Sequence, residues 1–319
     1  MSQRTHSSRA PAPDLRTHEG LVVASYGRHC VVESDDGVRR ICHPRGKKSQ
    51  ALVGDRVLWC PAPEGQGEEG TVEKVLPRRN LLYRQDELRT KSFAANIDQV
   101  LLLLAAERVF SESQLARALV AADSAGIPAL IGLNKIDKPS AAAARERLRP
   151  YREMGVQLLE VALKAEPAAA LALLQPLLQN KVTLLLGPSG TGKSTLINLL
   201  VPGAQVQTGE ISQALNSGKH TTTATRWYWV DRTSGTALID SPGFQEFGLH
   251  HIAPTQLAAC MPDIAAHASD CRFYNCTHLH EPGCGVISAV ENTDNADGIS
   301  ANRYKIYSDL FAELSQTRY

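Results

Sequence analysis

The sequence GPSGTGKS occupies residues 187–194 and matches the pattern G-x-x-x-x-G-K-[S/T]. It lies between an apolar run, Val182–Leu186, that predicts a buried strand and a segment, Ser194–Leu200, that predicts a helix. Glycines at such a junction let successive backbone N–H groups point at one phosphate, and the helix start adds partial positive charge. The predicted phosphate-binding residues are Gly187, Pro188, Ser189, Gly190, Thr191, Gly192, Lys193, Ser194 and Thr195.

Two of these residues have further expected roles. Lys193 is expected to bridge the outer phosphates and to assist catalysis, and the Ser194 hydroxyl to ligate Mg²⁺. The sequence DSPG at 240–243 follows the short apolar run Thr236–Ile239. Residues 187–194 are called the P-loop. A carboxylate at a strand end beside this loop can hold Mg²⁺, so Asp240 is a second magnesium candidate. Gly243 offers an N–H to a γ-phosphate, although D-x-P-G alone is also an ordinary turn.

The sequence NKID at 134–137 ends the apolar strand predicted over Pro128–Leu133. Asp137 can accept two hydrogen bonds from guanine, whereas adenine would leave the carboxylate unpaired. Asn134 can join neighbouring loops and the Lys135 stem can cover the base, with Ile136 between them. Three such motifs at the carboxyl ends of parallel strands predict a guanine-nucleotide site. The alternative, an ATP-dependent kinase or ATPase, conflicts with Asp137.

The order of the motifs is rotated. In ordinary GTPases the P-loop comes first and N-K-x-D last, but here the motifs begin at residues 134, 187 and 240 in the sequence N-K-x-D, P-loop, D-x-P-G. A binding site depends on where its residues lie in space and not on their order along the chain. A compact domain whose termini lie close together therefore tolerates circular permutation. The D-x-P-G segment then leads directly into the C-terminal part of the chain.

Composition limits the other possibilities. The chain has 319 residues, 43% of them hydrophobic, which allows two or three domains with a substantial core. The formal net charge is only +1, so the protein is not a polycation, and any nucleic acid would have to bind at a local basic patch. No secretory signal is visible, and the longest apolar run, Val100–Ala106, is too short for a membrane helix. Seven cysteines argue against a disulfide framework and for a cytoplasmic location.

The pattern along the chain predicts a multidomain α/β protein. Residues 1–18 are expected to be a disordered tail, 19–88 a five-stranded OB-type barrel (an SH3-like barrel is the alternative), 89–250 the GTPase domain and 251–319 a small polar unit. The barrel strands are expected at Leu21–Ser25, His29–Glu33, Val38–His43, Asp55–Cys60 and Thr71–Leu76.

In the GTPase region, strands alternate with helices, which predicts a mostly parallel sheet. Strands are expected at Asp98–Ala105, Pro128–Leu133, Gln157–Ala162 and Val182–Leu186. Helices are expected at Ser113–Ala125, Ala141–Met154 and Ala168–Gln179, the last interrupted by Pro176, and near the C-terminus at Arg303–Leu314. An Arg-rich connection links this region to the barrel.

A cysteine and histidine cluster stands out in the C-terminal unit. Cys271, Cys276, His278 and Cys284 supply three thiolates and one imidazole, which is a closed set for structural Zn²⁺. His280 competes with His278 for the fourth position. The cysteines of the barrel strands are expected to be small buried apolar residues.

Basic residues gather between Val38 and Gly54, a stretch without acids. A basic loop on an OB barrel predicts contact with the phosphates of RNA, although an ordinary solvated loop explains the charge equally well. The candidate RNA-binding residues are Arg39, Arg40, Arg45, Lys47 and Lys48.

Three blocks together resemble the circularly permuted ribosome-assembly GTPases of the RsgA (YjeQ) family: AANID at 94–98, GKHTTT at 218–223 and the Cys/His cluster. The resemblance covers residues 19–319. It implies an OB barrel, a permuted GTPase domain and a zinc domain in which His278 is the ligand. It also implies slow GTP hydrolysis, stimulated by the small ribosomal subunit and its rRNA, in late maturation of that subunit.

One loop departs from the family pattern. Where a serine usually stands near the guanine oxygen, this chain has VALK at 161–164, so a backbone N–H of Ala162 or Leu163 is the expected contact.

Hydrolysis without the usual glutamine should be slow, because Phe244 follows D-x-P-G. His220 is the candidate to orient the attacking water, although a residue that only packs or contacts RNA fits as well. One of the threonines at 221–223 should reach Mg²⁺, with Thr222 as the candidate. Besides an enzyme, which is expected to be a monomer, the sequence allows an RNA-binding zinc protein that only senses GTP.

Overall fold

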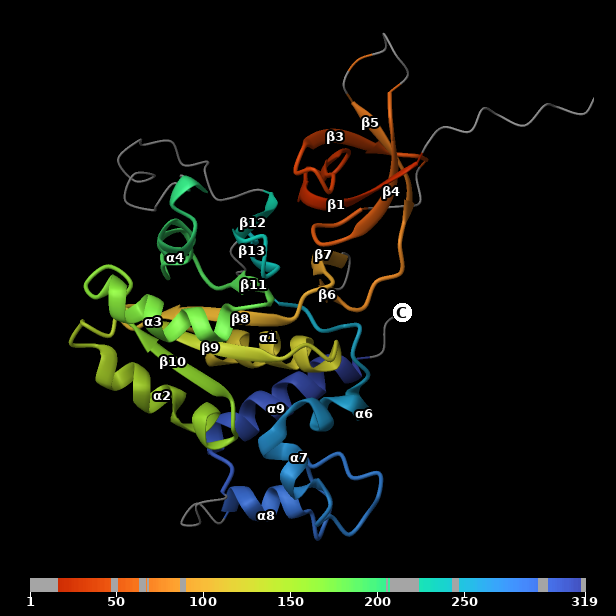
Figure 1. Ribbon diagram of the computed structural model, residues 1–319. Coiled ribbons are helices and arrows are strands. Elements are labelled where there is room, and N and C mark those ends of the chain that lie inside the picture. The colour runs from red at the N-terminus through yellow and green to blue at the C-terminus, as the bar shows by residue number, and fades with distance from the viewer. Residues whose placement is uncertain are drawn as a thin grey trace, which may run out of the picture.

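The computed structural model describes residues 17–46, 51–62, 67, 69–86, 90–204, 206, 224–242, 247–291 and 298–316 (Figure 1). Five strands form a closed N-terminal barrel: β1 (His18–Ser25), β2 (Cys30–Glu33), β3 (Arg39–Pro44), β4 (Arg56–Pro61) and β5 (Gly70–Val75). Their order is β1-β2-β3-β5-β4, and β1 pairs again with β4. This Greek-key closure, with β3 parallel to β5, is the OB arrangement and not the SH3-like alternative.

The inside of the barrel is apolar. Val22, Val32, Val57 and Val72 are fully buried around Trp59, as the alternating strand pattern predicts. Cys30, Cys42 and Cys60 are buried free cysteines on β2, β3 and β4, which confirms their expected packing role. Burial raises the pKa of Cys30 to about 12, so this thiol stays protonated.

The sheet of the predicted GTPase domain is parallel through five strands in the order β10 (Gln157–Val161), β9 (Ala129–Asn134), β8 (Gln99–Ala105), β11 (Val182–Leu186) and β13 (Thr236–Asp240). The helices α1 (Glu112–Ser124) and α2 (Ala141–Glu153) cover one face of this sheet. The opposite face is covered by α3 (Pro167–Leu178) and α4 (Lys193–Leu200), followed by the short helix η1 (Pro202–Ala204). Helices on both faces explain why the strands read as continuous apolar runs.

Local signals place two helix ends. The Ser111 side chain caps α1 by accepting a hydrogen bond from Gln114 N, two residues before the predicted start. Gly126, at φ 65°, ends the same helix. The predicted interruption at Pro176 is wrong: α3 runs through it. Proline removes one backbone hydrogen bond, and Pro176 lies two residues before the end of α3, so the helix continues through it for only that short distance.

Three strands were not predicted. β6 (Leu81–Gln85) and β7 (Thr90–Ala95) form an antiparallel pair where an Arg-rich connection was expected. β12 (Thr225–Asp231) runs antiparallel to β13 and pairs on its other side with β1 at Ala24↔Arg226. Barrel and GTPase strands therefore form one continuous sheet. Around this junction the buried Glu33 carboxylate accepts a hydrogen bond from Trp229 Nε1 at 2.7 Å and pairs with Arg232 at 2.8 Å.

The C-terminal unit contains α6 (Pro254–Leu257), η2 (Ala258–Cys260), α7 (Pro262–Ala268), α8 (Gly285–Glu291) and α9 (Ala301–Ser315). Its apolar residues join the core beneath α1 and α2, with Tyr307 and Leu310 of α9 in the same cluster as Tyr151 of α2. β1 begins at His18, and residues 1–16 lie outside the described ranges. The domain boundaries at 88 and 250 stay predictions. Among the described helices, none is both long and apolar enough to cross a bilayer.

Arg303 fastens α9 to this shared core. Its Nε and Nη2 donate to Asp263 at 2.7 and 2.9 Å, its guanidinium lies 5.0 Å from the Tyr151 ring centre, and only 3% of the residue is exposed. Arg303→Ala leaves Asp263 without its partner, so we expect a loss of about 3–5 kcal/mol in unfolding free energy, measured by denaturant titration. The control Lys305→Ala removes an exposed pair with Asp309 and should leave the midpoint unchanged. Equal denaturation midpoints for the two variants would contradict the stabilising role of the Arg303–Asp263 pair.

Candidate functional site

The P-loop turns sharply between β11 and α4. Gly187 and Gly192 have φ of 153° and 111°, values that favour glycine. A Cβ at Gly187 would lie 2.2 Å from the Leu103 carbonyl oxygen, and one at Gly192 would lie 2.3 Å from Asn134 Nδ2. Both positions therefore require glycine because neighbouring strands approach the loop closely. The predicted strand, loop and helix arrangement is present.

Lys193 begins α4 and lies inside the loop. Its Nζ donates hydrogen bonds to the carbonyl oxygens of Gly187 at 2.6 Å and Pro188 at 2.9 Å. Burial lowers the pKa of Lys193, and the nearby Asp240 carboxylate opposes that shift. The ammonium is thus held among backbone groups at the position where the motif predicts phosphates. Ser194 and Thr195 follow in the first turn of α4.

Asp240 ends β13 beside this loop, because it pairs in register with Leu185 of β11. The residue is 3% exposed, and its Oδ1 has no hydrogen-bond partner among the described residues. Burial raises the pKa of Asp240 to about 6, against the opposing charges of Lys193 and Arg226. A buried, unpaired carboxylate oxygen beside a phosphate-binding loop suits a hard cation such as Mg²⁺.

Asn134 connects three segments. Its Nδ2 donates to the Thr191 carbonyl oxygen at 2.9 Å, and its Oδ1 accepts from Leu163 N at 3.1 Å and from Lys135 N at 2.8 Å. The end of β9, the P-loop and the loop after β10 are therefore held together by one buried side chain. The Leu163 N–H, one of the two predicted guanine contacts in that loop, is already used by Asn134.

Asp137 and Lys135 lie in the turn after β9. Lys135 has φ 66° and forms an ion pair with Glu107, in the turn after β8. Asp137 pairs with Lys138 at 3.1 Å, and this hydrogen bond lowers the pKa of Asp137. The carboxylate therefore stays ionised and can act only as an acceptor, as recognition of guanine N1–H and N2–H requires.

Several predicted residues fall outside the described ranges. These are His220, the threonines at 221–223 including Thr222, Gly243 and Phe244 of the D-x-P-G region, and Lys47 and Lys48 of the barrel.

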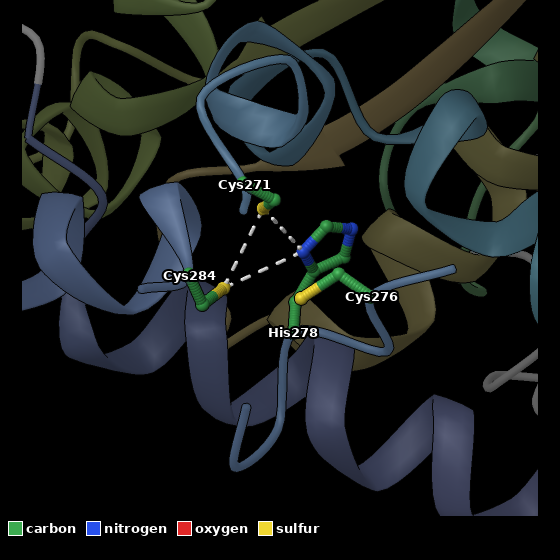
Figure 2. A group of neighbouring side chains, drawn as sticks. All are labelled: Cys271, Cys276, His278 and Cys284. Carbon is green, nitrogen blue, oxygen red and sulfur yellow. Dashed lines mark hydrogen bonds between the residues drawn. The ribbon is translucent and has the colours of Figure 1, made fainter. Parts of the chain in front are cut away.

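The four predicted metal ligands come together in the C-terminal unit (Figure 2). His278 Nδ1 lies 3.4 Å from Cys271 Sγ and 3.5 Å from Cys284 Sγ, and the two sulfur atoms are 3.8 Å apart. Cys276 joins them, and all four ligand atoms lie within 4.8 Å of one another. His278 belongs to this group, whereas the competing His280 does not and is exposed. The cluster can therefore hold a metal ion.

Three residues that sequence reasoning missed hold the loop carrying these ligands. Tyr304 and Tyr307 of α9 donate to the carbonyl oxygens of His278 at 2.8 Å and Thr277 at 2.9 Å. The Glu281 carboxylate accepts from the backbone N–H groups of residues 277, 279 and 280. Burial alone would raise the pKa of Glu281, but the hydrogen bond from the Thr277 hydroxyl and those from the backbone N–H groups keep it well below its usual range. Tyrosines at i and i+3 on an amphipathic helix were the available sequence signal.

The three candidate RNA-binding arginines that the structure describes have partners within the protein. Arg39 pairs with Glu33 at 2.7 Å, Arg45 pairs with Glu73, and the Arg40 guanidinium lies 5.4 Å from the Trp59 ring centre. The acids come from neighbouring strands and not from the loop itself. Ion pairs within the protein therefore neutralise part of the positive charge that was predicted to contact RNA.

Comparison with known proteins identifies the family of this chain. The family model described as RsgA GTPase matches residues 75–250. The chain belongs to the RsgA GTPase family. As a member of the RsgA family it is a GTPase, which confirms the expectation drawn from the three motifs.

Relatives match almost the entire chain. The small ribosomal subunit biogenesis GTPase RsgA of Variovorax paradoxus (strain S110) is 65% identical over 303 residues, which cover 95% of this chain and 94% of that protein. The protein of the same name from Paraburkholderia phymatum is 51% identical over 300 residues, with 93% and 92% covered.

Two solved structures share the architecture. YloQ, described as a circularly permuted GTPase, superposes with a TM-score of 0.66 at 26% identity and covers 97% of this chain and 100% of its own. YjeQ from Thermotoga maritima gives a TM-score of 0.70 at 28% identity, with 95% and 100% covered. The rotated order of the motifs is thus a circular permutation, as predicted.

Proposed function

We propose that this GTPase acts in late maturation of the small ribosomal subunit, in the cytoplasm and as a monomer. It would hydrolyse GTP slowly alone and faster on the subunit. Support comes from relatives up to 65% identical that are named small ribosomal subunit biogenesis GTPases. Support for GTP comes from Asn134, whose hydrogen bonds to Thr191 O and Leu163 N join the base-recognising turn to the P-loop. With these segments held together, guanine would bind at Asp137 and the phosphates at Lys193 of one site.

The roles of the phosphate-site residues follow from their positions. Lys193 would bind the outer phosphates, and Ser194 and Asp240 would hold Mg²⁺ together with Thr222. Bound Mg²⁺ supplies positive charge that offsets the phosphate oxygens. The unpaired Asp240 Oδ1 favours this assignment. His220 would orient the attacking water, and Gly243 would contact the γ-phosphate.

Zinc is the metal that best fits the C-terminal cluster. Four ligands around tetrahedral Zn²⁺, with Zn–S near 2.3 Å and Zn–N near 2.0 Å, place sulfur atoms about 3.8 Å apart and sulfur and nitrogen about 3.5 Å apart. The corresponding separations here are 3.8 Å for Cys271–Cys284 and 3.4 and 3.5 Å to His278. Four protein ligands leave no open position, so the proposed role is structural.

The RNA surface stays a prediction. The residues proposed to contact rRNA phosphates are Arg39, Arg40, Arg45, Lys47 and Lys48. The side chains of Arg39 and Arg45 are 49% and 68% exposed and so are available for this despite their ion pairs. Binding through such contacts should weaken steeply with salt.

The decisive experiment measures GTP hydrolysis with and without purified small subunits. Turnover should rise when subunits are added and should be lost in Lys193→Ala, because the phosphates lose their buried ammonium. A matched control is Lys181→Ala, which removes a lysine next to β11 whose Nζ donates to Gln99 Oε1 at 3.1 Å. Turnover that is equal with and without subunits would favour the alternative, an RNA-binding zinc protein that only senses GTP.

A further inference from the structure

An arginine outside the three nucleotide motifs lies against the P-loop. Arg108 belongs to the turn after β8, where its backbone N–H donates to the Ala105 carbonyl oxygen at 3.1 Å. A Cβ at Gly190 would lie 3.0 Å from Arg108 Cζ, 3.1 Å from its Nη2 and 3.3 Å from its Nε. The guanidinium therefore packs on the backbone of the loop that is predicted to enclose the phosphates.

The structure explains how this contact arises. β8 and β11 are neighbouring parallel strands, so the turn after β8 and the P-loop after β11 leave the sheet at the same edge (Figure 1). Gly190 has φ 80° and carries no side chain, which lets the guanidinium approach the main chain.

The charge of Arg108 is available to a ligand. Both Arg108 and Gly190 are exposed, and no ion pair or side-chain hydrogen bond formed within the described part of the chain involves the guanidinium. The adjacent acid, Glu107, is paired with Lys135 and so is already partly neutralised. Lys193 supplies one cation from inside the loop, and Arg108 adds a second from its outer edge.

We propose that Arg108 is a catalytic residue that contacts the phosphates of GTP and stabilises the charge that develops during hydrolysis. This inference rests on the proposed GTP site. In the reaction, a water oxygen bonds to the γ-phosphorus while the bond from that phosphorus to the β–γ bridging oxygen breaks. GDP keeps the electron pair, and the protons of water pass to inorganic phosphate and solvent. Negative charge grows on the bridging and β-phosphate oxygens.

A planar guanidinium suits this task. It offers several N–H donors in a fixed fork that matches phosphate oxygens, and it stays charged at any physiological pH. An arginine supplied by the same chain is one of the ways in which GTPases accelerate hydrolysis. The competing role is a cover for the P-loop backbone, which would affect stability and nucleotide binding but not the chemical step.

The test compares Arg108→Ala and Arg108→Lys with the control Arg149→Ala, an arginine of α2 that pairs only with Glu146 and Glu153 among the described residues. Intrinsic turnover without ribosomes should fall on the order of 10²-fold in Arg108→Ala, as when one transition-state donor is removed. Affinity for GTP and GDP should fall far less than turnover, because the proposed contact strengthens as charge develops, and formation of the GDP–aluminium fluoride complex should be lost. Arg108→Lys keeps the charge but not the forked N–H donors, so its turnover should lie between that of Arg108→Ala and that of the wild type.

Two results would overturn the proposal: wild-type turnover in Arg108→Ala, or a fall in GTP affinity as large as the fall in turnover, which indicates ground-state binding only. Lys193→Ala in the same assays separates this proposal from the GTP site itself. If Lys193→Ala binds and hydrolyses GTP normally, the proposed site is wrong. If only the Arg108 variants behave like wild type, the site stands and Arg108 has no catalytic role.

Discussion

Asp137→Asn should weaken GTP binding at least about 10²-fold, because two charge-assisted hydrogen bonds to guanine are lost and an amide donor faces the donors of the base. The carboxylate is in the right state for this role. Its pKa, already well below neutral pH for an aspartate, is lowered further by the hydrogen bond from Lys138 3.1 Å away, so the carboxylate is ionised with or without that partner. The turn that carries it is fixed to the P-loop through Asn134 and Thr191 O.

The same change should raise affinity for xanthosine triphosphate. Xanthine carries a carbonyl oxygen where guanine has its amino group, and an asparagine amide can donate to it. ATP should bind neither form well. Dissociation constants for the three nucleotides, measured by titration of a fluorescent analogue, give the preference directly. Lys138→Ala is the matched control, because it removes the partner of Asp137 but keeps the carboxylate, and guanine preference should survive. An unchanged preference in Asp137→Asn would place the base elsewhere.

The parts of this site that were predictable share one property: each is encoded by a short, local stretch. The P-loop needs glycine at residues 187 and 192 because of positive φ and close strands, and the sequence carries both. The N-K-x-D and D-x-P-G motifs follow apolar runs that form β9 and β13. Parallel strands bring their carboxyl ends to one edge, so local motifs were enough to assemble a pocket despite their rotated order.

The parts that were missed depend on contacts between distant segments. β12 is a strand because it pairs with β13 on one side and with β1 on the other. Polar and apolar residues near Arg226 do not alternate clearly enough to predict a strand from the sequence. Glu33 forms ion pairs with Arg39 and with Arg232, which lies in the turn after β12. Counting the basic residues between Val38 and Gly54 alone therefore overestimated the positive charge of this surface. Arg108 is also separated in sequence from the loop it touches.

Removing the proposed zinc ion should have the largest effect on folding. Structural Zn²⁺ typically contributes on the order of 10–16 kcal/mol of binding free energy in small zinc domains, and this energy is available only when the ligands are brought together. In the described C-terminal unit, Cys271 precedes the loop and Cys284 precedes α8, so the ion would tie α7 to α8. Cys284→Ser should therefore yield protein without bound zinc in which α7, α8 and the loop between them exchange amide hydrogens rapidly.

The matched control is Cys260→Ser, a buried free cysteine of η2 in the same unit that is not part of the cluster. It should keep stoichiometric metal, measured by atomic emission on the purified protein, and slow exchange in α8. Retention of metal by Cys284→Ser would remove this thiolate from the ligand set. Slow exchange after metal loss would mean that Tyr304, Tyr307 and Glu281 alone hold the loop, because their hydrogen bonds to it do not require the ion. Loss of both metal and protection is the expected result, since most side chains of the loop between α7 and α8 are not buried and the ligands are brought together only when the ion is bound.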